Sequence, residues 1–173
     1  LECIARLPYN PAHERANDGK CDPLGRFWVG TRDERPGGVG GGGQAAVYCM
    51  DARQVGPAQV KRMWGGGGTF NGLAWSPDQC TLYSADTPTH RIKARDWNGE
   101  HNTLGPARVL HQFAMKPGGC QPGQCVPYGG RQDGAAVDAQ GNYWCALFEG
   151  GHVVQLSPAG ELLQSLANHP AVW

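Results

Sequence analysis

The sequence lacks long apolar runs, a net charge and a signal-peptide core. No apolar stretch approaches the roughly 18 residues that a membrane-spanning helix requires, so we expect no membrane segment. The 15 basic and 15 acidic residues give a formal net charge of zero, which leaves no electrostatic footprint for nucleic acid or an anionic membrane. The chain begins without Met and without an apolar leader, and we therefore expect either a piece of a longer protein or a processed product. The location that we expect for it is cytoplasmic.

The seven cysteines form no Cys-x-x-Cys pair, and their odd number excludes complete pairing within the chain. Cys21, Cys49 and Cys145 lie in apolar, strand-like runs, where we expect them to act as small hydrophobic residues. Cys120 and Cys125 flank a Pro/Gly loop and can pair if the compartment is oxidising. The pattern leaves the compartment open, with a reducing one favoured.

Several catalytic motifs are also missing. There is no Gly-x-Ser-x-Gly nucleophile elbow and no His-Glu-x-x-His zinc motif, and the six histidines share no ligand spacing. The stretch 36–44 resembles a phosphate-binding loop only in glycine content, because no Lys-Ser/Thr pair and no helical pattern follow it. The residues therefore give no support to an elbow-type serine hydrolase, a zinc protease or a P-loop protein.

What is present is a repeat. The 27 Gly and 13 Pro, with few windows of helical period, indicate strands and turns. In each of three segments an Asn or Asp lies five residues before a turn residue, and an aromatic strand follows. The pairs are Asn17 and Asp22, Asn71 and Ser76, and Asp133 and Asp138. A period of about 55–60 residues predicts a toroidal all-β architecture.

A second repeat interleaves with the first. Alternating strands are predicted at 45–51, 90–99 and 152–160, and the last two run into hairpin turns. Four strands per roughly 55 residues is typical of a propeller blade, so the chain holds about three blades where a closed ring usually has 4–8. We expect residues 1–173 to form one partial propeller domain, an internal fragment of a larger ring. Pairing of two such chains is the less favoured alternative.

The repeat predicts a polar site. If the first strand of each blade is innermost, Asn17, Asn71 and Asp133 all face the axial channel. Their oxygens suit Ca²⁺, Mg²⁺ or Mn²⁺, with Zn²⁺ as an alternative, and a single carboxylate is too little charge for tight binding. Arg15 shares a strand face with Asn17. The structural alternatives are Asx side chains that cap their own turns and a surface arginine.

Three segments carry a family resemblance. Arg15–Thr31, Phe70–Thr87 and Asp133–Trp144 resemble, in order, the signatures of the SMP-30/gluconolactonase/regucalcin (SGL) family. The resemblance implies a six-bladed β-propeller with a divalent metal, Ca²⁺ or Zn²⁺, on its axis. Most members open aldonolactones, so it also implies a sugar lactone as the small-molecule partner.

The resemblance also implies roles for single residues. Asn71 and Asp133 match two of the family's metal ligands, and Asp133 matches its general base. Arg15 and Asn17 match substrate-contacting positions, and a further acidic contact falls near Asp33 or Glu34. The family's glutamate ligand and its last blade have no counterpart here, and Gln132 replaces a common Pro.

The expected function is metal-dependent hydrolysis of sugar lactones by the parent protein. Two alternatives stay open: a non-catalytic propeller that binds calcium or another ligand, and a truncated chain without activity. The sequence does not choose a lactone, a metal or an oligomeric state.

Overall fold

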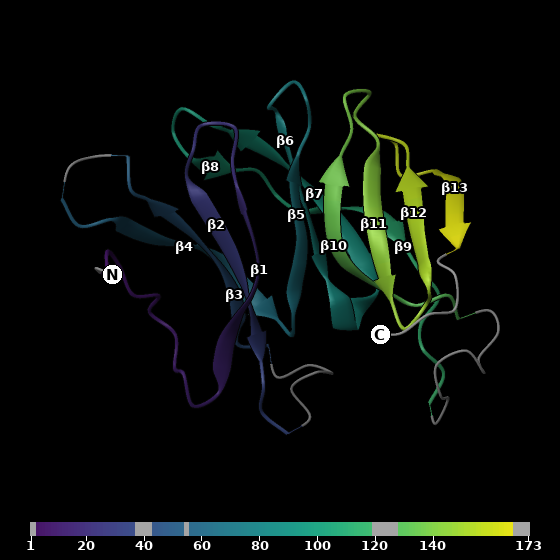
Figure 1. Cartoon of the computed structure of the whole chain (residues 1–173), viewed down its shortest axis with the longest axis horizontal. Helices are drawn as coiled ribbons and strands as arrows, with labels where there is room; N and C mark the ends of the chain where they lie inside the picture. The colour runs from purple at the N-terminus through teal and green to yellow at the C-terminus, as the bar shows by residue number, and fades with distance from the viewer. Residues whose placement is uncertain (1–2, 37–42, 54–55, 119–127, 168–173) are drawn as a thin grey trace.

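The computed structural model describes residues 3–36, 43–53, 56–118 and 128–167. Cys120 and Cys125, whose pairing the sequence leaves open, and most of the glycine loop 36–44 fall outside these ranges. Within them no helix has the length and apolarity that crossing a bilayer demands. Nearly all regular structure is strand (Figure 1), which confirms the prediction of an all-β chain.

The strands form three antiparallel sheets, each a meander in chain order. The first contains β1 (Glu14–Cys21), β2 (Phe27–Asp33), β3 (Ala45–Asp51) and β4 (Gln59–Gly67). The second contains β5 (Phe70–Trp75), β6 (Thr81–Asp86) and β7 (Arg91–Asn98), with β8 (Thr103–Leu104) and β9 (Arg108–Gln112) both paired to β7. The third contains β10 (Arg131–Val137), β11 (Tyr143–Phe148), β12 (His152–Leu156) and β13 (Leu162–Ala167). The two-hairpin unit predicted from the repeats is confirmed.

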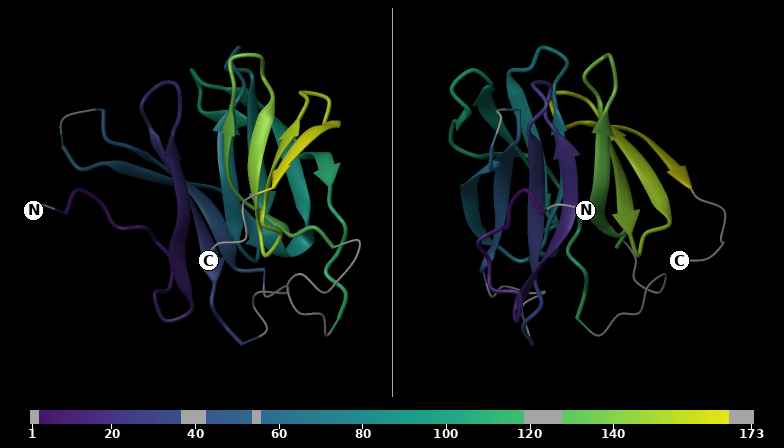
Figure 2. Two further views of the ribbon diagram at one scale, coloured as in Figure 1. Left: turned by 45° about the vertical axis from the view of Figure 1, so that its right-hand side comes forward. Right: turned by 60° about the vertical axis from the view of Figure 1, so that its left-hand side comes forward.

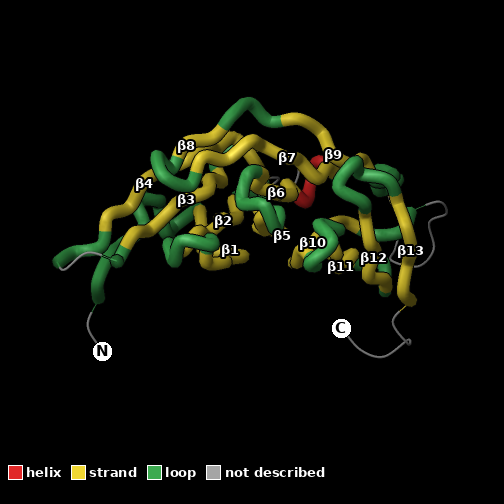
Figure 3. The backbone as a smooth tube through the Cα atoms, turned by 90° about the horizontal axis from the view of Figure 1, so that it is seen from above, coloured by secondary structure: helices red, strands yellow, loops and turns green. Residues whose placement is uncertain are grey.

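The sheets stand side by side like blades. Seen from above in Figure 3, they fan out along an arc, with β1, β5 and β10 gathered at its inner side. The turned views in Figure 2 show the same separation of the three sheets. Strand β5 contacts both β1 and β10, so the first strand of every sheet is innermost, as predicted.

Aromatic residues fill the spaces between the sheets. Trp28 of the first sheet meets Trp75 of the second with ring centroids 5.5 Å apart. Tyr83 of the second sheet meets Tyr143 of the third at 5.4 Å. All four rings are buried, so burial of large aromatic surface holds neighbouring sheets together.

The cysteine prediction is confirmed at two positions and wrong at a third. Cys49 and Cys145 are buried, but Cys21 is exposed. The reason is strand alternation. Cys21 pairs with Phe27, and paired residues of an antiparallel ladder share a face. Phe27 is itself 38% exposed, so both side chains project from the outer face of this hairpin end.

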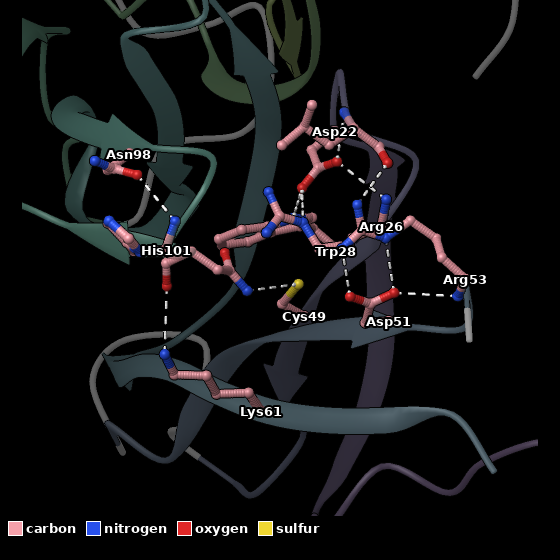
Figure 4. Close-up of polar contacts among 11 residues, drawn as sticks. Asp22, Arg26, Trp28, Cys49, Asp51, Arg53, Lys61, Asn98 and His101 are labelled. Atoms are coloured by element: carbon pink, nitrogen blue, oxygen red, sulfur yellow. Dashed lines mark hydrogen bonds and ion pairs between the residues drawn. The ribbon is translucent and has the colours of Figure 1, made fainter. Parts of the chain in front are cut away.

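The turn residues of the repeat, five positions after each Asn or Asp, hold their turns in place through hydrogen bonds. Asp22 Oδ1 accepts hydrogen bonds from the backbone N–H groups of Leu24 and Arg26, and Oδ2 accepts from Arg26 Nε at 2.6 Å and Trp28 Nε1 at 2.9 Å (Figure 4). Asp138 repeats the scheme, accepting from two turn N–H groups and from Trp144 Nε1 at 2.9 Å. These carboxylates therefore anchor the turns that directly follow the inner strands β1 and β10.

Candidate active site

A β-bulge lies at the first half of each repeat. The ladder register slips between Ala16 and Gly19 in β1, between Asn71 and Ala74 in β5, and between Gln132 and Ala135 in β10. A bulge inserts an extra residue and re-aims the side chains beside it. The Asn71-Gly72 and Asp133-Gly134 pairs thus lie within strands and not in hairpin turns.

The three inner strands bring the predicted site residues to one cavity. Arg15, Asn17, Asn71 and Asp133 all line a pocket of about 450 Å³. Because the pocket lies where β1, β5 and β10 converge, each sheet contributes to it. The geometry therefore unites the four residues, while the roles assigned to them stay predictions.

A chain of hydrogen bonds crosses the pocket. Arg15 Nη1 donates to Asn17 Oδ1 at 3.0 Å, and Asn17 Nδ2 donates to Asn71 Oδ1 at 2.8 Å. Asn71 Nδ2 donates to Thr87 Oγ1 at 2.8 Å, and that hydroxyl donates to the Gln132 carbonyl at 2.8 Å. Both ends of the buried Asn71 amide are engaged, which fixes its orientation and turns its oxygen toward Asn17.

Asp133 is the electrostatically perturbed member of the set. Burial raises the pKa of its carboxyl group, and the negative charge of nearby Asp18 raises it further, against a lowering hydrogen bond from the Gly134 N–H. Asp18 lies on the β1 bulge beside Asn17. A carboxylate whose charge is destabilised inside a polar cavity is a frequent mark of a functional site, because a bound cation or a proton relieves it.

The donor set fits a hard divalent cation in type. Asn71 Oδ1 accepts one hydrogen bond and keeps a second lone pair, and the Asp133 carboxylate lines the same pocket. The described ranges hold no group of three or more His, Cys, Asp or Glu side chains placed for a metal. Two candidate oxygen donors thus line the same pocket, and their role as metal ligands stays a prediction.

The acidic contact predicted near Asp33 or Glu34 takes a different form. Asp33 is buried and paired with Arg35, which holds the pKa of that carboxyl well below its usual range. Glu34 accepts a hydrogen bond from Arg15 Nε at 2.8 Å. Neither is among the residues that line the pocket. Glu34 contacts Arg15, which does line it and whose side chain is 46% exposed.

The pocket also has a second row of side chains, beside the row formed by Asn17, Asn71 and Asp133, and three of its members, Arg131, Arg32 and Glu149, were not predicted. Arg131 lies two residues before Asp133, as Arg15 lies two before Asn17, and it too lines the pocket. The strand alternation that predicted a shared face for Arg15 and Asn17 therefore also predicts one for Arg131 and Asp133. Arg32 also lines the pocket because it pairs with Arg15 across the β1–β2 ladder. Glu149 comes from the turn after β11, for which the sequence has no local signal.

The β5 bulge gives a sharp prediction for stability. Gly72 has a φ of +60°, and a methyl group there would overlap the Tyr143 hydroxyl, which donates to the Gly72 carbonyl at 2.7 Å. We expect Gly72→Ala to lower the free energy of unfolding by about 2–5 kcal/mol, from the left-handed backbone and the overlap together. Urea unfolding of the purified protein measures this.

The chain supplies two controls for that measurement. Gly134 holds the equivalent place at the β10 bulge, with open space around its α-carbon, so Gly134→Ala should change stability by at most about 0.5 kcal/mol. Tyr143→Phe removes the oxygen that the new methyl would meet. The double variant should therefore lose less than the sum of the two single losses, and strict additivity would contradict the overlap.

Comparison with known proteins places the chain in a family. Residues 1–170 match the model of the SMP-30/gluconolactonase/LRE-like region. The 6-deoxy-6-sulfogluconolactonase of Pseudomonas putida is 38% identical over 99% of this chain and 52% of its own length. Regucalcin of Gallus gallus is 29% identical over 94% of this chain and 50% of its own.

The fold comparison agrees. A luciferin-regenerating enzyme superposes with a TM-score of 0.78 at 29% identity, over 95% of this chain and 50% of that one. The chain thus spans about half the length of the relatives it matches. It belongs to the SMP-30/gluconolactonase/LRE-like family.

Proposed function

We propose that the protein hydrolyses the ring ester of sugar lactones with the help of a divalent cation. The observation that carries this proposal is the single cavity in which a carboxylate of raised pKa, Asp133, lies with the oriented amide of Asn71 and the donors Asn17 and Arg15. The similarity to a 6-deoxy-6-sulfogluconolactonase supports the same reaction class. In this proposal the three sheets are half of a six-bladed propeller whose axis holds the cavity.

The residues of this chain have separate tasks in the reaction. Asn71 and Asp133 would hold the cation, which supplies electrophilic polarisation of the lactone carbonyl when it is bound. Asp133 accepts the proton of the attacking water, a task that suits a carboxylate whose pKa is raised by burial. Asn17 and Arg15 donate hydrogen bonds to the sugar hydroxyls and fix the ring in the pocket.

A lactone panel tests the proposal. The full-length protein is assayed by acid release on aldonolactones and on a simple aliphatic lactone, first as purified, then with EDTA, then with Ca²⁺, Zn²⁺, Mg²⁺ or Mn²⁺ restored. We expect turnover that chelation lowers at least about 100-fold and that one cation restores. Turnover that EDTA leaves unchanged would reject the role of the metal. A protein that binds a cation but opens no lactone would favour the alternative of a non-catalytic binding propeller.

A further inference from the structure

The second row of the pocket is rich in positive charge. The residue two positions before each repeat Asn or Asp lines the pocket. Two of these three residues are arginines, Arg15 and Arg131, and the third is Thr69, just before β5. Arg32 joins them from β2. Three guanidinium groups therefore line one pocket together with two acids, Asp133 and Glu149.

The acids neutralise this charge unevenly. Arg15 is paired with Glu34 at 2.8 Å. Arg131 Nη2 lies 3.1 Å from Glu149, but Glu149 is shared, since Lys116 Nζ lies 2.8 Å from it and Tyr128 donates its hydroxyl at 2.7 Å. No ion pair to Arg32 is present among the described residues. Arg32 and the partly compensated Arg131 are thus the surplus cations of the site.

The hydrogen bonding of Arg32 and Arg131 also indicates an excess of donors over acceptors. The Nε atoms of Arg32 and Arg131 are buried, and no residue of the described ranges accepts a hydrogen bond from either of them. Buried donors on a charged group are rarely left without an acceptor, because their desolvation is unfavourable. The described part of the chain thus leaves both side chains short of acceptors, and an acceptor of negative charge is the group that would satisfy them.

We propose that Arg32 and Arg131 bind an anionic substituent of the substrate, so that the preferred lactone carries a sulfonate, phosphate or carboxylate group. This inference rests on the proposed function and narrows it. Guanidinium groups match such anions through paired, charge-assisted hydrogen bonds. The anionic group of the substrate would lie beside Arg32 and Arg131, while its ring ester would face Asp133 and Asn71.

Matched substrates test the inference. Gluconolactone is compared with its 6-sulfonate and 6-phosphate analogues and with a lactone that carries a 6-carboxylate, and kcat/KM is measured for the full-length protein. We expect the anionic lactones to be preferred at least about tenfold, as one or two charge-assisted hydrogen bonds imply. The ranking of the three anions identifies the natural substituent.

Arginine variants locate the effect. Arg32→Gln and Arg131→Gln should each lower the anionic-to-neutral ratio of kcat/KM by about 10- to 100-fold, and Arg32→Lys should restore part of it. Arg108→Gln is the matched control, because this arginine is exposed, pairs with Asp96 and lies outside the pocket. Should a variant fail to fold, competition by sodium sulfate against neutral-lactone turnover in the unaltered protein asks the same question.

The outcomes separate the two proposals. Calorimetric binding of 6-deoxy-6-sulfogluconate needs no turnover. Binding that both Gln variants weaken, without hydrolysis of any lactone, would overturn the lactonase proposal and leave the anion site standing. The opposite outcome is equal turnover of neutral and anionic lactones, with no inhibition by sulfate and an unchanged anionic-to-neutral ratio of kcat/KM in the variants. That outcome would overturn the anion site and leave the lactonase proposal standing.

Discussion

Replacing Asp133 by Asn should lower kcat for lactone opening by about 10²- to 10⁴-fold, the range expected when a general base is lost. The amide keeps the shape of the side chain, but it accepts no proton and brings no charge to a cation. The affinity for the activating metal should fall together with kcat. Lactone turnover by the full-length variant, measured over a range of metal concentrations, gives both quantities.

Stability separates this effect from a folding defect. Burial and Asp18 raise the pKa of Asp133, so its ionised form is held in the folded state at a cost at neutral pH. Asp133→Asn should therefore leave the melting temperature unchanged or higher while activity falls. Asp96→Asn, an exposed carboxylate on β7, is the control and should keep full turnover. An Asp133→Asn protein with turnover close to that of the parent would exclude Asp133 as the base.

Replacing Asp22 by Ala should lower the free energy of unfolding by about 3–5 kcal/mol, as expected when a buried ion pair loses one partner. Arg26 and Asp22 have side chains only 3% and 0% exposed. The variant would leave the Arg26 guanidinium and the Trp28 indole N–H without their acceptor. Because a domain is stable by only about 5–15 kcal/mol in total, urea unfolding should show a large shift of the midpoint.

Two further variants test the cause of that loss. Ser76→Ala removes the equivalent turn hydroxyl of the second sheet, a neutral group that accepts from the Thr81 N–H at 2.9 Å, so we expect a loss of only about 1 kcal/mol. Asp22→Ala combined with Arg26→Met removes both charges and should recover part of the stability. If the double variant is as unstable as Asp22→Ala, the loss of stability comes from the lost turn hydrogen bonds and not from the unpaired charge of Arg26.

Much of the fold was predictable because the sequence repeat indicates both the strands and their relative register. The strand predicted at 45–51 is β3 with the same bounds, and the predicted convergence of Asn17, Asn71 and Asp133 follows from their equal register on the innermost strands. Strand alternation was applied to Arg15 but not to Arg131, where it holds equally well.

Other features had no signature in the sequence. Arg32 enters the pocket because the β1–β2 ladder pairs it with Arg15 through a bulge that no local pattern predicts. Glu149 enters from the turn after β11, because the β10–β11 ladder pairs its neighbour Phe148 with Arg131. The exposure of Cys21 was missed because an apolar neighbourhood in the sequence does not say which face of a strand is covered.

The hydrogen-bond chain across the pocket also bears on the order of folding. Each sheet is a meander of neighbouring strands, so its ladder closes over short stretches of chain. The bond from Asn17 to Asn71 spans 54 residues and that from Thr87 to Gln132 spans 45, and such distant contacts form late because loop closure opposes them. Far-ultraviolet signals should therefore recover before lactone turnover during refolding, which makes activity the stricter reporter of a fully docked molecule.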